Sequence, residues 1–306
     1  MNLRPFIVFA AIAALLIGFI YWREHVTPPA AKVWHKAVEH RPAIAKKVAK
    51  RKEVVTKEVA VKETAAKEVK EIKEAVVQPP PVPRVRKMPK VAIVIDDFGY
   101  SMNNLETFFN IKEPLTLSIL PNQRYSHEVA NEAHSRGYEV LLHLPLEALS
   151  KDAPEESGTI RTGMVEKEVN SRLKRDLTGV PYIIGVSNHQ GSKATEDKDL
   201  MGEILIYLKE KKLYFFDSLT SQNSVCREVA AETGVKYARR DIFLDNSSDI
   251  AAIEDQMAKL RKMALARGRA IAICHDRKNT AAVLSKVMPE MAKEGIEFVS
   301  LSDMVK

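Results

Sequence analysis

The sequence predicts an α/β domain with a mostly parallel sheet, barrel-like or doubly wound, over residues 91–306. Short runs rich in β-branched residues alternate there with longer amphipathic stretches. Strands that alternate with helices require crossover connections, which join parallel neighbours. The length of this region suits seven or eight such units. A third observation, the polar residues that follow most strands, indicates where a site would lie.

Eight short runs are predicted as strands, beginning with the apolar VAIVI at 91–95. The others are 115–120, 138–142, 181–186, 213–216, part of 236–244, 269–274 and 296–299. Helices fit between them, for example at 125–136, 196–211, 249–267 and 280–293.

An apolar segment opens the chain. Pro5 to Trp22 carries no charge, and it ends in Tyr21 and Trp22, aromatic residues typical of a membrane interface. Residues 1–22 are therefore predicted to be an N-terminal membrane anchor, with a cleaved signal peptide as the alternative.

Residues 23–90 are rich in Lys, Glu and Pro and are predicted to form a stalk. The repeat KEVVT KEVAV KETAA KEVKE at 52–71 has a period of five, so no apolar face persists along a helix. The same period places Glu four residues before Lys, a favourable helical pair. Prolines at 79–81 and 83 then end any helix. The stalk is either a solvated helical spacer or a disordered charged linker.

The net charge of +7 does not belong to the predicted domain. Residues 23–90 carry 18 Lys/Arg against 8 Asp/Glu, whereas residues 91–306 carry 28 against 32. A folded domain that is mildly acidic lacks the basic surface that nucleic acid requires. We therefore expect no nucleic-acid partner.

Nearly every chemically capable residue of the domain follows a predicted strand. The carboxyl ends of parallel strands meet at one edge of the sheet, where active sites gather. Helix caps would explain some Asp, Ser and Asn residues at these positions, but they do not explain three histidines. The residues are Asp96, Asp97, His143, Asn188, His189, Asp217, Ser218, Asp241, Asp245 and His275.

Aspartate and histidine side chains at one edge are suitable ligands for Zn²⁺ or a similar divalent ion. Such an ion lowers the pKa of water and polarises a carbonyl group. A second carboxylate beside the ligand can then accept a proton. We therefore expect Asp96 and Asp97 to divide these two tasks, one binding metal and one serving as base.

Six motifs in order resemble those of the divergent polysaccharide deacetylase family, part of the polysaccharide deacetylase-like superfamily. They are IDDFGYS, GYEVLLHLPLE, GVSNHQGS, FFDSLTS, IFLDN and AICHDRKNT. The resemblance covers roughly residues 90–306 and leaves the anchor and stalk outside. It implies a distorted, incomplete β/α barrel of about seven mostly parallel strands for residues 91–306.

The resemblance also implies roles for four residues. Asp96 would be the general base, and Asp97 would bind metal together with His143. His275 would protonate the departing amine. These roles carry over from motif positions of the superfamily and describe removal of an acetyl group from an amide.

One departure from the superfamily concerns the third metal ligand. Its mainstream second motif has another histidine four residues after the first, and this chain has Glu147 there. The mainstream arginine–proline motif also has no evident counterpart. We expect His189 as third ligand, with Glu147 as alternative ligand or as a partner that orients His143. The residues expected to bind substrate are Asn188, Asp217, Ser218 and Asp245.

Two functions remain open at this level. The first is a metal-dependent deacetylase-like hydrolase, with zinc as the expected ion, acting on N-acetylated envelope glycan. The alternative is a non-catalytic member of the same fold, tethered to the envelope, that binds a glycan or a protein partner. In both, the resemblance and the stalk imply a single-pass anchor in the inner membrane and a domain in the periplasm.

Other reactive or charged residues are expected to have no catalytic role. Consecutive residues of a strand point to opposite faces, so Cys274 and His275 are not expected to form a nucleophilic pair. Cys226 is the only other cysteine, and two cysteines do not reveal the redox compartment. Four cations near the motifs are interpreted as solvated charges, with contact to an acidic substrate as the alternative; they are Lys193, Arg239, Arg240 and Arg277.

Overall fold

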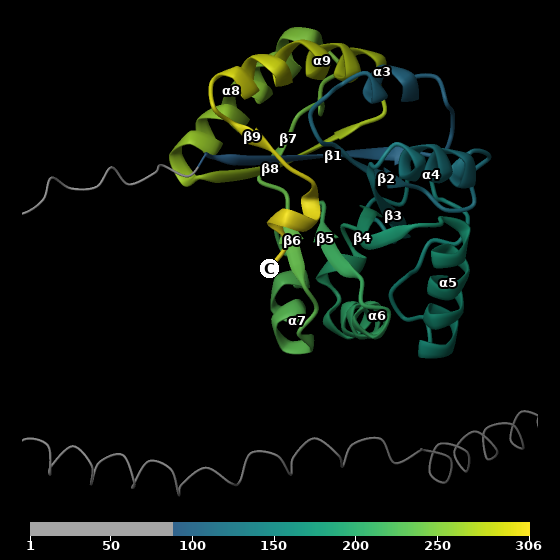
Figure 1. Cartoon of the computed structure of the whole chain (residues 1–306). Helices are drawn as coiled ribbons and strands as arrows, with labels where there is room; N and C mark the ends of the chain where they lie inside the picture. Colours follow the sequence, from purple (N-terminus) through teal and green to yellow (C-terminus); the bar gives the residue numbers. More distant parts are fainter. Residues whose placement is uncertain (1–87) are drawn as a thin grey trace, which may run out of the picture. The chain divides into compact units, whose positions relative to one another are not determined.

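The computed structural model describes residues 88–306, which form one curled sheet of nine parallel strands covered by helices (Figure 1). The strand order is β6-β5-β4-β3-β2-β1-β8-β7, and β9 pairs with β1. The strands are β1 (Lys90–Phe98), β2 (Thr116–Ile119), β3 (Glu139–Leu146), β4 (Ile183–Gln190), β5 (Tyr214–Asp217), β6 (Tyr237–Arg239), β7 (Ile242–Phe243), β8 (Arg269–His275) and β9 (Glu297–Phe298).

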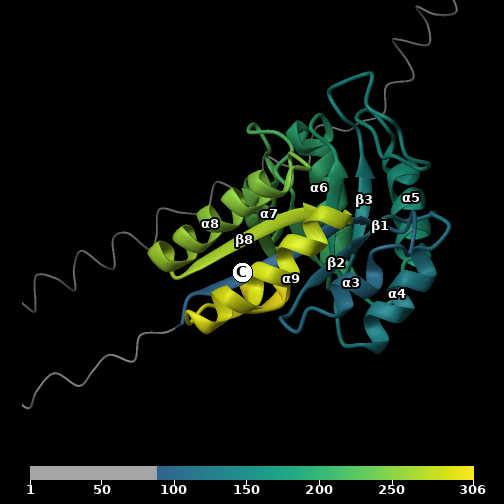
Figure 2. The same cartoon turned by 90° about the horizontal axis from the view of Figure 1, so that it is seen from above.

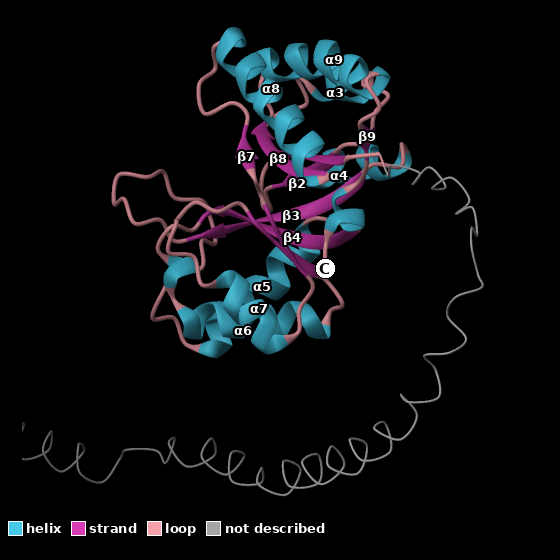
Figure 3. Cartoon of the chain, turned by 90° about the vertical axis from the view of Figure 1, so that its left-hand side faces the viewer, coloured by secondary structure: helices cyan, strands magenta, loops and turns pink. Residues whose placement is uncertain are grey.

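The α-helices lie on the outer side of the curl. In Figure 3, α3, α8 and α9 lie above the strands and α5, α6 and α7 lie below them, and Figure 2 shows α8 and α9 beside β8. Their bounds are α3 (Leu105–Phe109), α4 (Ser126–Ser135), α5 (Glu166–Gly179), α6 (Lys198–Glu210), α7 (Cys226–Thr233), α8 (Ile250–Arg267) and α9 (Lys278–Lys293), with short 3₁₀ helices η1 (Ala194–Glu196) and η2 (Leu301–Met304).

The curl does not close into a complete barrel. Within residues 88–306, the edge strands β6 and β7 each pair with one neighbour only, and not with each other. This parallel half-barrel confirms the predicted α/β class and incomplete barrel. All eight predicted strands form, and 236–244 divides into two short strands, β6 and β7, so the sheet has nine strands where the resemblance implied about seven.

Alternation along each strand separates two cores. In β1, Val91, Ile93 and Ile95 pack under the helices, whereas Ala92 and Val94 face the inside of the curl. The inner core also holds apolar residues of the other strands and of the C-terminal segment: Leu141, Tyr214, Phe216, Ala238, Ile271, Ile273, Val299, Leu301 and Met304. This core occupies the strands up to their last few residues. The inward-facing positions that follow, at the carboxyl ends of the strands, lie beyond this core.

Three strands are longer than the sequence pattern predicted. β1 continues through the paired aspartates to Phe98, β3 continues to Leu146, and β4 to Gln190. The β3–β4 ladder persists to the pair Leu146 and Gln190, so backbone pairing extends beyond the apolar runs. The polar motifs therefore belong to the strand ends themselves.

The predicted anchor at residues 1–22 and the predicted stalk at 23–90 lie outside the described residues, except that 88–90 are described and β1 begins at Lys90. Across residues 88–306, none of the helices combines the length with the apolar character that crossing a membrane demands.

Candidate metal centre

The paired aspartates of β1 reach the same cavity because the strand is irregular at Asp97. Neighbouring residues of a regular strand point to opposite faces. Asp97 instead has φ of 66°, and the register with β2 shifts between Ile95 and Phe98. A non-glycine residue in this left-handed region costs on the order of 1 kcal/mol or more, and such strain concentrates at functional sites. Both carboxylates consequently line one cavity.

Asp97, His143 and His189 form a compact cluster at the ends of β1, β3 and β4. Asp97 Oδ1 lies 3.3 Å from His143 Nε2 and 3.0 Å from His189 Nδ1. One ligand atom from each residue lies within 4.8 Å of the other two. Among residues 88–306 this is the one group of three or more His, Cys, Asp or Glu side chains with such spacing.

His143 is held with one ring nitrogen toward the cluster. Its Nδ1 lies 2.7 Å from Ser187 Oγ, which lies 2.6 Å from Ser118 Oγ. Nε2 is therefore the atom that faces Asp97. Burial lowers the pKa of His143 to about 4, so the imidazole is neutral at pH 7 and keeps the lone pair that a metal requires.

The two aspartates have opposite electrostatic environments. Burial alone would raise the pKa of Asp97, but hydrogen bonds from His143 and His189 lower it below its ordinary value. Burial, reinforced by the neighbouring charge of Asp97, raises the pKa of Asp96 well above its ordinary value. Asp96 is only 4% exposed, and its Oδ1 has no hydrogen-bond partner within the described chain. A carboxylate with a free, buried oxygen requires a further partner.

His275 ends β8 on the other side of β1 and is oriented by Asp245. Its Nδ1 lies 2.9 Å from Asp245 Oδ1, and its backbone N–H donates to Asp245 Oδ2. Thr280 Oγ1 donates to the same Oδ2 atom. His275 Nε2 remains directed toward the cluster, 3.7 Å from Asp97 Oδ2.

A cavity of about 440 Å³ joins these groups. Ser218 lines it and is 2% exposed, and its Oγ has no partner among the described residues. Asn188 also lines it, but its amide supports the wall by accepting from Ser218 N–H and donating to the Gln190 carbonyl. The cavity thus offers one uncommitted buried hydroxyl beside the cluster.

Three expected roles need correction. Glu147 is not in the cluster, because its carboxylate accepts from Thr162 and pairs with Lys193 at 2.8 Å. Asp217 is not at the cavity: alternation turns it outward, where Leu219 N–H, the Ser224 hydroxyl and the Tyr237 hydroxyl donate to it.

The third correction concerns Asp245, which was expected to bind substrate. It lines the cavity, but it is fully buried and both of its oxygens accept hydrogen bonds from His275 or Thr280. Its structural position is therefore that of a residue that orients His275.

Arg240 and Arg277 were interpreted as solvated charges, yet both line the cavity. Arg240 is two residues after the inward-facing Ala238, and it donates to the carbonyls of Ser218 and Leu219. The alternation of β6 was the signal that could have placed it inside. Ser118 on β2 and Ser187 on β4 support His143 from either side of β3, and their contact can be found only once the pairing of these three strands is known.

The cluster fits a divalent metal ion. Zinc binds carboxylate oxygen and imidazole nitrogen at about 2.0–2.2 Å, so tetrahedral ligand atoms lie about 3.4 Å apart. The observed 3.0 and 3.3 Å separations are close to this spacing. A carboxylate with two imidazoles also leaves one coordination position open, which is typical of catalytic zinc. Asp97, His143 and His189 can therefore hold such an ion.

Comparisons with known proteins identify the family and the fold. The family model of divergent polysaccharide deacetylases matches residues 93–305. The uncharacterized protein YibQ of Escherichia coli strain K12 is 37% identical over 199 residues, which cover 65% of this chain and 62% of the relative. The chain thus spans less than two thirds of that relative's length.

A second relative is an uncharacterized protein of Haemophilus influenzae Rd, 36% identical over 215 residues that cover 70% of this chain and 76% of the relative. Among solved structures, an uncharacterized protein from Agrobacterium tumefaciens C58 superposes with a TM-score of 0.69 at 23% identity, covering 72% of this chain and 90% of that chain. This last likeness establishes the fold.

The family model covers more than half of the chain and includes all six motifs found in the sequence. The family expected from the resemblance of those motifs is confirmed. The chain belongs to the divergent polysaccharide deacetylase family.

Proposed function

We propose that this chain is a metal-dependent hydrolase that removes N-acetyl groups from an envelope glycan. The observation that carries the proposal is the position of Asp97, His143 and His189 in one cavity with a buried carboxylate, Asp96, and an oriented imidazole, His275. Amide hydrolysis needs a polarised carbonyl, a base and an acid, and the cavity contains groups suited to each task.

Asp97, His143 and His189 would hold the ion. A divalent cation in this position supplies Lewis acidity, which lowers the pKa of water and polarises the acetyl carbonyl. Ser187 keeps His143 Nε2 directed inward for this purpose. Membership of the family supports zinc as the ion to test first.

Asp96 is suited to accept the proton of the attacking water. Its Oδ1 is buried and has no hydrogen-bond partner in the described residues. In the absence of a cation, burial raises the pKa of this carboxyl group. Positive charge beside Asp97 favours the ionised carboxylate, which is the form that accepts a proton.

His275 is suited to donate a proton to the departing amine nitrogen. Asp245 holds its Nδ1, so Nε2 is the atom available at the cavity. The carboxylate of Asp245 also stabilises the protonated imidazole that this role requires. The base and the acid thus approach the cavity from neighbouring strands, β1 and β8.

The proposal includes a location for the reaction. Residues 1–22 would anchor the chain in the inner membrane, and residues 23–90 would hold the domain near glycan in the periplasm. Protease treatment of intact spheroplasts tests this location. Cleavage of the domain without lysis is expected, and full protection would rule out the periplasmic orientation.

The enzymatic test measures acetate released from N-acetylglucosamine oligomers and peptidoglycan fragments by the full chain in detergent with added Zn²⁺. Wild type should release acetate, and Asp97→Ala should not. Full activity of Asp97→Ala would contradict the mechanism. Glycan binding without acetate release, unchanged in Asp96→Asn, would instead establish the alternative of a non-catalytic binding protein.

A further inference from the structure

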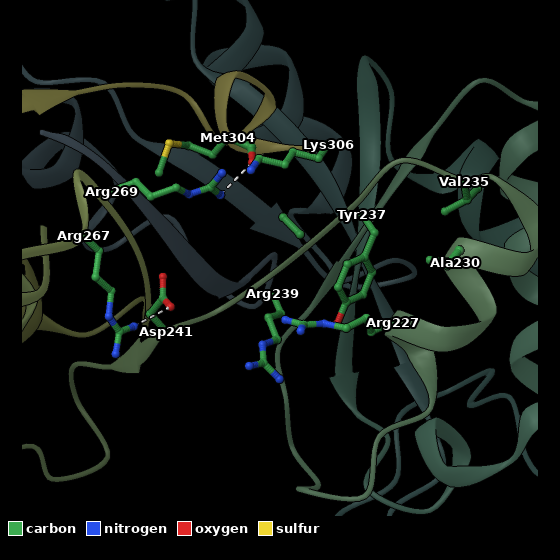
Figure 4. Close-up of a pocket in the computed structure, with 12 residues that line it drawn as sticks. Arg227, Ala230, Val235, Tyr237, Arg239, Asp241, Arg267, Arg269, Met304 and Lys306 are labelled. Atoms are coloured by element: carbon green, nitrogen blue, oxygen red, sulfur yellow. Dashed lines mark hydrogen bonds and ion pairs between the residues drawn. The ribbon is translucent and has the colours of Figure 1, made fainter. Parts of the chain in front are cut away.

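A second cavity of about 600 Å³ lies at the open edge of the half-barrel, where it is lined by residues of α7, β6, the end of α8 and the start of β8. We call it the seam cavity and define it by Arg227, Tyr237, Arg239, Asp241, Arg267 and Arg269, which line it together with Lys306 and several small or apolar residues. In Figure 4, Arg267 and Arg269 lie on one side of the opening and Arg227 on the other, with Arg239 between them. None of these residues lines the cavity of the metal centre.

The seam cavity has an excess of positive charge. Four arginines and Lys306 line it with a single carboxylate side chain, that of Asp241. Asp241 Oδ1 lies 3.4 Å from Arg267 Nη1, and Arg269 Nη2 donates to the Met304 carbonyl at 2.8 Å. Within residues 88–306, the guanidinium groups of Arg227 and Arg239 have neither an ion pair nor a hydrogen bond to the protein. Like charges around one cavity repel each other, and an anion relieves the repulsion.

The position of Arg227 is not explained by the stability of its helix. It is the second residue of α7, near the helix N-terminus. The helix dipole disfavours a positive charge there. An anion in the seam cavity would offset this unfavourable interaction, because it would bring negative charge to the same end of the helix.

The arrangement favours phosphate over an extended acidic peptide. A guanidinium group donates two parallel hydrogen bonds to phosphate oxygens, and Tyr237 provides an apolar wall beside them. An extended peptide that binds by adding a strand to the sheet would instead need a free strand edge. At Tyr237 the edge of β6 already exchanges backbone hydrogen bonds with Lys306, of 2.8 and 3.3 Å.

We propose that the seam cavity is a binding site for a phosphate ester, with Arg227 and Arg239 as its principal ligands. The ester is either a soluble phosphorylated compound or the headgroup of an anionic phospholipid. The site is independent of the proposed deacetylase reaction. The two cavities nevertheless share one segment, because Arg239 lines the seam cavity and the next residue, Arg240, lines the metal centre.

The test is calorimetric titration of the full chain, in an uncharged detergent, with pyrophosphate. The double variant Arg227→Gln/Arg239→Gln should bind about tenfold more weakly or worse, since each arginine contributes charge-assisted hydrogen bonds. Both side chains are exposed, so the fold should persist. The matched control is Lys167→Gln/Lys174→Gln, which removes two exposed charges from α5 and should bind like wild type. Asp97→Ala should also bind like wild type, which excludes pyrophosphate bound at the metal centre.

A second titration distinguishes the two sources of phosphate. Glycerol 3-phosphate is compared with dihexanoyl-phosphatidylglycerol, and dihexanoyl-phosphatidylcholine controls for the acyl chains. Equal affinity for the first two ligands would identify a soluble phosphate ester. Tighter, arginine-dependent binding of phosphatidylglycerol would identify a lipid headgroup.

Two results would overturn the proposal. The first is that wild type does not bind pyrophosphate at millimolar concentrations, or that the double arginine variant binds it as tightly as wild type does. The second is arginine-dependent binding of a hexaglutamate peptide that is tighter than binding of pyrophosphate. That result would make the seam cavity a peptide site.

Discussion

Asp96 and His275 are register partners on the adjacent parallel strands β1 and β8, and both line the cavity of the metal centre. The ladder between these strands runs without interruption from Lys90 to Asp96. The spacing between the proposed base and the proposed acid is therefore set by strand pairing and not by mobile loops. A site built on paired strands keeps its geometry better than one built on loops. Substitutions at either residue should accordingly change the chemistry and leave the metal ligands in place.

The first prediction concerns the third ligand. His189→Ala should lose bound zinc, because its Nδ1 lies 3.0 Å from Asp97 Oδ1 within the cluster. Glu147→Ala should keep zinc, because that carboxylate is engaged by Thr162 and Lys193. Metal content after zinc loading and desalting distinguishes the two variants. Zinc retained by His189→Ala but lost by Glu147→Ala would show that the described geometry is not that of the metal-bound protein.

The second prediction concerns the orientation of His143. Ser187→Ala removes the hydroxyl 2.7 Å from His143 Nδ1, so the imidazole is no longer held with Nε2 inward. Loss of such an outer partner costs about 10- to 100-fold in metal affinity. Zinc affinity measured by competition with a chelating dye checks this. The matched control is Ser285→Ala on α9. The Ser285 hydroxyl donates to the Ala281 carbonyl, so the variant should bind zinc like wild type.

Apolar runs that end in polar residues were enough to predict an α/β domain with a mostly parallel sheet and much of the site, whereas the incomplete barrel was implied by the resemblance of the six motifs. VAIVI followed by two aspartates, and AIAIC followed by His275, place chemistry at strand ends because parallel strands share one carboxyl edge. The pattern could not predict that β1 would continue through Asp97 with φ of 66°. That irregularity decides whether one carboxylate or two can reach the cavity.

Adjacent polar residues show what a strand pattern leaves undetermined. Asp217 and Ser218 follow the same apolar run, yet only Ser218 lines the cavity. The face that each occupies depends on the register of β5 against β4 and β6. Arg239 and Arg240 separate in the same way into two cavities. A one-residue change of register exchanges the faces, so such assignments need neighbouring strands.

The third prediction separates chemistry from metal binding. Asp96→Asn should retain zinc, since Asp96 is outside the cluster of three ligands. Acetate release should fall by about 10²- to 10⁴-fold, the usual contribution of a general base. Parallel measurements of zinc content and acetate release provide the test. Asp303→Asn, an exposed change in η2, is the control. Unchanged activity of Asp96→Asn would assign the base to another residue.

The fourth prediction concerns the pH dependence of stability. Burial alone would raise the pKa of Asp245, but the hydrogen bonds and charge of His275, with Thr280, lower it below the ordinary 3.8. A carboxyl group with a lowered folded-state pKa stabilises the fold above its unfolded pKa, and the contribution is lost as pH falls through the folded value. Asp245→Asn should therefore be less stable at pH 7 by about 1–3 kcal/mol.

The difference in the free energy of unfolding between wild type and Asp245→Asn should narrow as the pH falls below 3.8. Urea unfolding at a series of pH values measures it. The control is Asp255→Asn, an exposed change on α8. Its free energy of unfolding should differ from that of wild type by no more than about 0.5 kcal/mol at pH 7. If the difference in unfolding free energy between wild type and Asp245→Asn widened toward low pH, Asp245 would not be the ionised partner of His275.

The fifth prediction tests the packing beneath the site with two glycine substitutions. A Cβ at Gly185 in β4 would lie 2.5 Å from Tyr214 Cε2 and 2.6 Å from its Cζ. The ring cannot swing away freely, because the Tyr214 hydroxyl donates to buried Glu139. Gly185→Ala should therefore destabilise the domain by about 1–3 kcal/mol, the usual cost of overpacking.

Gly202 on α6 provides the matched control for Gly185→Ala. A Cβ there meets nothing within 4 Å, and alanine is a better helix former than glycine by about 0.5–1 kcal/mol. The same chemical change should thus destabilise at Gly185 and stabilise at Gly202, as measured by the midpoint of urea unfolding. Equal effects at the two positions would mean that β4 and β5 are not packed as described. The inner wall that carries His189 would then lack its proposed support, because β4 holds both Gly185 and His189.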